Sequence, residues 1–110
     1  MTKKKSELLH GTLELLILKL VEREPMNGYG MGLRIQDITD DALRVEEGSL
    51  YPALYRMEKR GWLKSAWQAT ENNRRAKYYR ITPTGRRQLH QELARWGAFS
   101  TAVAKILEIA

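Results

Sequence analysis

Apolar residues recur at helical spacing in four stretches of this chain. In the first stretch, residues 8–23, they recur at three- and four-residue steps, as in one buried face of an amphipathic helix: Leu9, Leu13, Leu16, Ile17, Leu20 and Val21. Pro25 and the Asn27-Gly28 pair predict the end of this helix. A second helix, over about residues 28–38, is predicted from Met31, Ile35 and Ile38, although its interior glycines disfavour it.

A third helix, over about residues 49–60, has one apolar side and one aromatic and basic side. Its apolar side contains Leu50, Ala53, Leu54 and Met57. The other side contains Pro52, Tyr55, Arg56 and Lys59, with Tyr51 at the edge. Ser49 is expected to cap this helix, Pro52 to lie in its first turn and Gly61 to end it. Before it, Asp40-Asp41 predicts a turn, and the alternating residues 43–45 predict a very short strand.

Two strands separated by a polar loop are predicted next, over residues 62–68 and 76–81, with the loop at 69–75. Tyr78 and Tyr79 fall on opposite faces of the second strand, so one of them is expected in the core. Trp62 and Trp67 are expected to pack against the domain. The segment is therefore predicted to form a β-hairpin.

The last helix is predicted to begin at Pro83, after a Thr82 cap. Its apolar residues follow a heptad seam, widened by Phe99 and Ile106: Leu89, Leu93, Trp96, Ser100, Val103 and Leu107. The rest of the chain has too few apolar residues to cover a stripe of this length, so we expect this helix to pair with the same helix of a second copy. Packing on its own domain is the alternative. The predicted organisation is a polar arm (1–7), a domain (8–82) and a dimerisation helix (83–110).

Charge is concentrated in one part of this basic chain. The chain has 110 residues, with 19 Lys and Arg against 13 Asp and Glu, and a formal net charge of +6. Residues 56–87 contain ten basic and two acidic residues, which gives this window a net charge of +8. Such a field favours a polyanionic partner, nucleic acid before an anionic membrane. The apolar stretch near the N-terminus is interrupted by His10, Glu14 and Lys19, so neither a signal peptide nor a membrane span is expected.

The order helix, helix, short strand, helix, hairpin, helix predicts an α+β, mostly α, winged helix-turn-helix fold. In this fold the third helix enters the DNA major groove, while a basic wing follows the backbone or enters the minor groove. The residues predicted to contact double-stranded DNA are Ser49, Tyr51, Pro52, Tyr55, Arg56, Lys59, Asn73, Arg74, Arg75 and Lys77. For Tyr51 and Tyr55, a place at the rim of the core is the alternative.

Several motifs give the chain a resemblance to the PadR family of bacterial transcriptional regulators, from about residue 9 to residue 107. The motifs are Gly28-Tyr29-Gly30, Gly48-Ser49-Leu50-Tyr51-Pro52-Ala53-Leu54, Glu58-Lys59-Arg60-Gly61-Trp62-Leu63, Arg74-Arg75-Ala76-Lys77-Tyr78-Tyr79-Arg80-Ile81-Thr82 and Gly85-Arg86. The resemblance implies a dimeric winged-helix repressor that binds a palindromic promoter site and is often released by a small ligand. A cytoplasmic protein is expected because neither a signal peptide nor a membrane span is predicted. It assigns recognition to residues 49–59, the wing to residues 72–77 and dimerisation to the single C-terminal helix.

Other classes of function have less support in the sequence. No cysteine is present, the two histidines are isolated, and no group of side chains has catalytic spacing, so no enzyme activity, metal site or cofactor is expected. The glycines of residues 28–32 match neither a P-loop nor a dinucleotide motif. RNA-binding motifs are missing, while a winged-helix module that binds only proteins stays open as an alternative. Trp96 and Phe99 could stack a flat aromatic ligand between two C-terminal helices, although interface packing is the favoured interpretation.

Overall fold

The computed structural model of the chain describes the backbone of residues 2–109 and the side chains of residues 12–109. In chain order the elements are α1 (Thr2–Arg23), β1 (Met26–Asn27), α2 (Gly28–Ile38), α3 (Glu47–Lys59), β2 (Leu63–Ala69), β3 (Arg75–Ile81) and α4 (Pro83–Leu107). This is the predicted winged-helix arrangement with a long C-terminal helix. The backbone of residues 2–7 continues α1, where a separate arm was expected. Met1, Ala110 and the side chain of Leu9 lie outside the described part.

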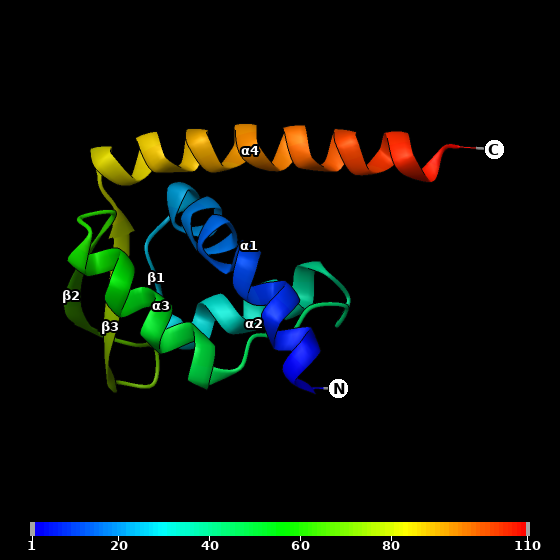
Figure 1. The fold of residues 1–110 in the computed structure, drawn as a ribbon. Coiled ribbons are helices and arrows are strands. Elements are labelled where there is room, and N and C mark those ends of the chain that lie inside the picture. The colour runs from blue at the N-terminus through cyan, green and yellow to red at the C-terminus, as the bar shows by residue number, and fades with distance from the viewer. Residues whose placement is uncertain (1, 110) are drawn as a thin grey trace.

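The core lies where α1, α2, α3 and the root of the hairpin meet, with α4 lying across α1 (Figure 1). α1 contributes Leu13, Ile17 and Val21, as predicted, together with Leu18. The four apolar residues predicted for α3 are all buried: Leu50, Ala53, Leu54 and Met57. The opposite side of α3 is therefore directed away from the core.

The sheet has three antiparallel strands in the order β1-β3-β2. The strand predicted at residues 43–45 is wrong, because this segment makes no strand pairing. β3 has only two edges: β2 occupies one, and β1 occupies the other through the pairs Met26↔Tyr79 and Asn27↔Tyr78. Asn27 also caps α2, since its side-chain oxygen accepts a hydrogen bond from the Gly30 amide at 2.6 Å. This cap joins the start of α2 to the sheet.

α3 begins earlier than the sequence predicts. Its N-cap is Glu46, so Ser49 lies inside the first turn and is not the cap. Pro52 consequently lies beyond the first turn, where its missing N–H removes the bond to the carbonyl of Gly48. The backbone of Glu46 is still extended, and its side chain makes no capping hydrogen bond that would mark the start of the helix. At the other end, Gly61 adopts a φ of +79° and the helix stops, as predicted.

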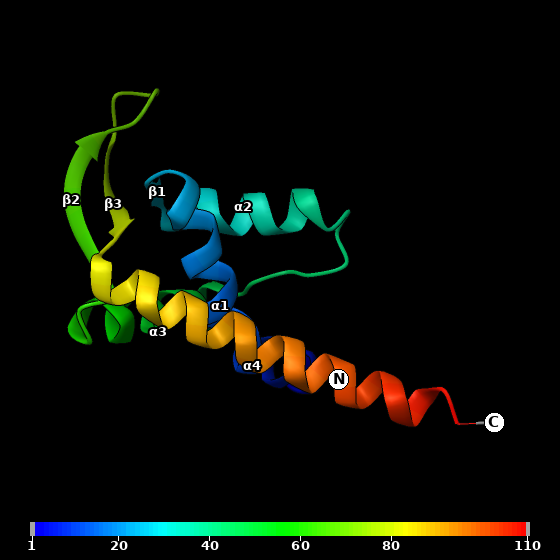
Figure 2. The same ribbon diagram turned by 90° about the horizontal axis from the view of Figure 1, so that it is seen from above.

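α4 starts on the domain and then leaves it (Figure 2). Thr82 caps the helix as predicted, with its hydroxyl oxygen accepting from the Gly85 amide at 2.9 Å. Gly85 and Leu89 are buried, whereas nearly all the side chains from 93 to 109 are exposed. Within residues 2–109, none of the helices combines the length and the apolar character that a membrane crossing needs.

Candidate DNA-binding surface

The exposed face of α3 displays a ladder of aromatic and basic side chains. Tyr51, Tyr55 and Lys59 follow each other at four-residue spacing and all three are exposed, with 63% of Tyr55 accessible to solvent. The Lys59 ammonium lies 5.4 Å from the centre of the Tyr55 ring, a cation–π distance. Pro52 is exposed and Ser49 is half-buried beside this ladder. The alternative that the two tyrosines complete the core rim therefore fails for Tyr55.

Tyr51 is positioned by the start of α2. A Cβ atom added to Gly28 would lie 2.7 Å from Cε1 of the Tyr51 ring, so the ring occupies the space that a side chain would need. Because Gly28 follows the cap residue Asn27, the Tyr51 ring rests on a fixed helix end. The Tyr51 side chain therefore has a defined position on the exposed face of α3.

Arg56 is directed toward α1 instead of standing free on the exposed face. Its Nε lies 3.8 Å from Oε2 of Glu14, and Nη1 of Arg60 lies 3.5 Å from the same oxygen. Partly exposed ion pairs of this kind stabilise a protein by at most about 1 kcal/mol. Arg56 is predicted to contact DNA, and its ion pair with Glu14 gives it a second role, which is to join α3 to α1.

The hairpin ends in a tight polar turn that carries two exposed arginines. The Thr70 amide donates to the Arg74 carbonyl at 2.6 Å, and the Asn73 amide donates to the Thr70 carbonyl at 2.9 Å. Asn73 has a φ of +60°, so its backbone is in the left-handed region within the turn. Its side chain is exposed. Among the described side chains, neither Arg74 nor Arg75 takes part in an ion pair. The wing tip therefore presents two guanidinium groups that no described side chain holds in an ion pair.

The hairpin is attached to the C-terminal part of α3 through Glu58. The Ser65 hydroxyl donates to Oε2 of Glu58 at 2.5 Å, and Nζ of Lys77 lies 3.4 Å from Oε1. Lys77, predicted to contact DNA, is thus held against α3. Tyr79 fulfils the prediction that one of the paired tyrosines is in the core, and burial raises the pKa of its phenol while Lys77 acts in the opposite direction. These contacts fix the hairpin relative to the exposed face of α3.

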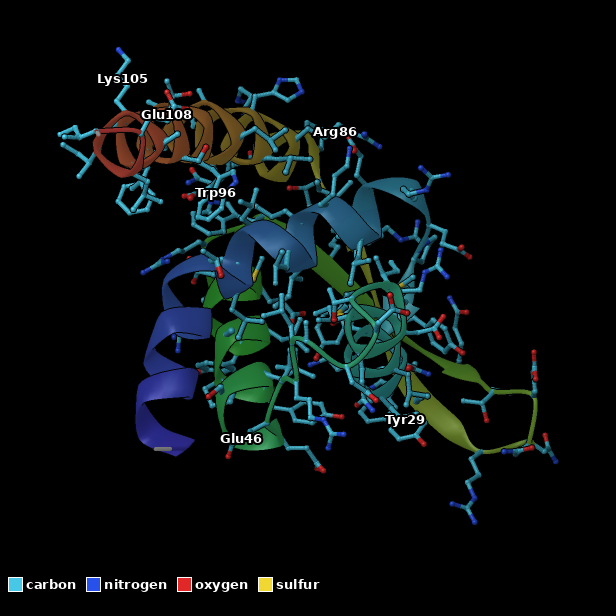
Figure 3. The ribbon with its side chains drawn as sticks, turned by 90° about the vertical axis from the view of Figure 1, so that its right-hand side faces the viewer. Tyr29, Glu46, Arg86, Trp96, Lys105 and Glu108 are labelled. Carbon is cyan, nitrogen blue, oxygen red and sulfur yellow. The ribbon has the colours of Figure 1, made fainter. Side chains whose placement is uncertain are left out.

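Figure 3 shows that Glu46, next to the start of α3, and Tyr29, at the start of α2, lie on the same side of the molecule as the wing tip. Tyr29 is 72% exposed and was not among the predicted contacts. The only signal for it was an aromatic residue between two glycines, which does not indicate exposure. Trp67 was predicted to pack but is 59% exposed, because the hairpin extends past the helices. Two more aromatic side chains are therefore exposed than the sequence predicts.

The predicted dimer residues divide into two groups. Leu89 is fully buried in the chain's own core and is therefore not free to form an interface, because α4 crosses α1 at this point. The others are exposed or half-buried on the part of α4 that leaves the domain: Leu93, Trp96, Phe99, Ser100, Val103 and Leu107. Trp96 and Phe99 have ring centres 6.0 Å apart, and Trp96 lies on the side of α4 toward α1 (Figure 3).

Known proteins resemble this chain in both sequence and fold. The model of the PadR-like family of transcriptional regulators matches residues 17–91. A solved transcriptional regulator from Clostridium thermocellum is 31% identical, covers 94% of this chain and all of its own, and superposes with a TM-score of 0.85. A PadR-like transcriptional regulator from Bacillus cereus is 33% identical, with coverage of 96% and 100% and a TM-score of 0.82. A transcriptional regulator of Mycobacterium tuberculosis is 39% identical over 57 residues, which is 52% of each chain.

The family match covers the elements that form the described surface. It extends from the last turns of α1 through the wing to the first turns of α4. The resemblance drawn from the sequence motifs is therefore confirmed. The chain belongs to the PadR-like family of transcriptional regulators.

Proposed function

We propose that the protein is a homodimeric repressor that inserts α3 into the major groove of duplex DNA and lays the β2–β3 hairpin over the adjacent backbone. The observation that carries this proposal is that the start of α3 and the arginine-tipped wing lie on one side of the molecule (Figure 3). Arg74 and Arg75 are exposed there without carboxylate partners among the described residues. Guanidinium groups that are free of ion pairs at this position suit phosphates or a narrow minor groove.

The exposed stripe of α4 supports pairing with a second copy. Six apolar side chains project from the part of the helix beyond the domain: Leu93, Trp96, Phe99, Val103, Ile106 and Leu107. A contiguous apolar surface of this kind is unfavourable in water, and a symmetric partner helix would bury it. Two copies would present two recognition helices, so we expect a palindromic site with half-sites about one helical turn (~34 Å) apart.

Salt dependence tests the DNA-binding part of the proposal. The double variant Arg74→Ala/Arg75→Ala should bind all duplexes more weakly, and its slope of log affinity against log salt should fall by about 0.9 for each phosphate that the wing no longer neutralises. The matched control is Lys64→Ala/Arg80→Ala, which removes two charges from a directly opposed pair on the other face of the same hairpin. An unchanged slope in the first variant would show that the wing does not touch phosphates. A wild-type protein without salt-dependent duplex binding would favour the protein-interaction module instead.

Sedimentation tests the dimer. Val103→Glu puts a charge into the middle of the exposed stripe and should produce a monomer at micromolar concentration, with loss of binding to a two-half-site duplex. Thr101→Glu is the matched control, because residue 101 is exposed on the side of α4 opposite the stripe. A wild-type protein that sediments as a monomer at this concentration would refute the dimer.

The aromatic pair of α4 supports a proposal for release. Trp96 and Phe99 lie within stacking distance of each other and both are exposed in the single chain, so two paired helices would bring two such pairs near the symmetry axis. We therefore propose that a flat aromatic effector binds between these two pairs of rings. Titration with planar aromatic compounds should quench tryptophan emission in the wild type but not in Trp96→Ala. Equal quenching in both proteins would indicate that these rings serve only as interface core.

A further inference from the structure

Trp67 is exposed although it lies on the inner face of the hairpin. The register of β2 and β3 places it on the same face as Leu63 and Tyr79, which are 2% and 6% exposed. Trp67 itself is 59% exposed. The difference arises because the helices cover only the root of this face, while the hairpin continues beyond them (Figure 2). A large indole therefore faces solvent without contributing to the core.

The neighbours of Trp67 on this face are cationic. Lys77 is directly opposite Trp67 on β3, and Arg75 lies diagonally from it, with the guanidinium carbon 5.9 Å from the centre of the indole ring. Glu58 compensates the charge of Lys77. The described residues offer no such carboxylate to Arg75, so the indole face is the group that orients its guanidinium.

This pair lies where a DNA strand would pass in the proposed complex. If α3 occupies the major groove and the wing tip reaches the next minor groove, the sugar–phosphate strand between the two grooves follows the inner face of the hairpin. Such a strand alternates anionic phosphates with apolar sugar faces. Arg75 and Trp67 present the complementary groups, a cation and an apolar ring, side by side.

We propose that Trp67 is a DNA-contacting residue of the wing, which packs against a deoxyribose of this strand and holds the Arg75 guanidinium toward the neighbouring phosphate. This inference rests on the proposed function and adds to it a residue and a role. It also explains why a tryptophan stands at an exposed position of a polar hairpin, where it contributes little to the stability of the free protein.

Affinity measurements on the full chain test this role of Trp67. Trp67→Ala should weaken duplex binding roughly three- to tenfold, the range expected for removal of an aromatic–cation pair of this kind. Gln68→Ala should leave the affinity unchanged, because Gln68 is exposed on the opposite face of the same strand. Because Trp67 is largely exposed, the melting temperature of Trp67→Ala should match that of the wild type, which separates a role in DNA binding from a folding defect.

A double-mutant cycle tests whether Trp67 acts through Arg75. The variant Trp67→Ala/Arg75→Ala should bind about as weakly as the weaker single variant, because the two side chains act as one unit. Strictly additive losses of binding free energy would overturn the positioning role. Wild-type tryptophan emission should also change when a duplex is added, and this change should disappear in Trp67→Phe even where that variant still binds.

The outcomes distinguish this inference from the function on which it rests. A wild type that fails to bind duplex DNA would refute the proposed function. A wild type that binds, together with an unaltered affinity for Trp67→Ala and an unaltered emission change in Trp67→Phe, would overturn the role of Trp67 alone.

Discussion

Gly85 joins the first turn of α4 to the hairpin, and its replacement by alanine should destabilise the whole domain. A Cβ atom at this position would overlap the carbonyl oxygen of Trp62 and lie 2.9 Å from Cγ1 of Ile81. The same carbonyl accepts the Thr82 amide at 3.1 Å. Restoring an ordinary C···O separation of ~3.3 Å requires the start of α4 to move away from this carbonyl. The movement would also disturb the Thr82 cap.

The expected destabilisation follows from this geometry. Overpacking of this kind costs roughly 1–3 kcal/mol and removal of a helix cap about 1 kcal/mol, while replacing a helical glycine regains about 0.5–1 kcal/mol. We therefore expect the free energy of unfolding of Gly85→Ala to fall by about 2 kcal/mol, which corresponds to roughly 10 °C in melting temperature for a chain of this size.

Urea denaturation followed by far-UV circular dichroism, at one fixed protomer concentration, measures this destabilisation. Gly32→Ala is the matched control, because a Cβ built on this helical glycine meets no atom within 4 Å beyond its chain neighbours and its own helix backbone. Its midpoint should rise by the equivalent of about 0.5–1 kcal/mol. If Gly85→Ala also raised the midpoint, the close packing of α4 against the Trp62 carbonyl would be refuted.

Two further substitutions separate the role of the candidate DNA-binding surface from the stability of the fold. Gly28→Ala should displace the ring of Tyr51, a side chain that can move, so we expect reduced duplex affinity in a binding titration with a nearly unchanged melting temperature. An unchanged affinity would show that the position of Tyr51 is unimportant for binding. Glu58→Gln removes the charge that holds Lys77, so duplex binding should change while stability falls by less than about 1 kcal/mol, as for other partly exposed pairs. Equal affinity of this variant and the wild type would argue against a positioning role for Glu58.

Local patterns in the sequence predicted most of the elements, because helix periodicity, caps and turns depend on residues close together in the chain. The range of α2, the Thr82 cap, the stop at Gly61 and the buried side of α3 were all predicted correctly. The motifs also identified the family. The start of α3 was misplaced because Glu46 caps it without a side-chain hydrogen bond, so the residue type carries no signal.

Packing between distant segments was decided only by the tertiary structure. Which segment pairs with the free edge of β3 depends on where the chain returns in space, so β1 was missed and a strand at residues 43–45 was wrongly expected. In the same way, crossing α1 buries Leu89. Extension of the hairpin past the helices exposes Trp67 on a face whose root is buried. The sequence by itself determined most of the elements and the family, whereas the packing of those elements determined which side chains are exposed on the candidate DNA-binding surface, because exposure depends on neighbours that are remote in the chain.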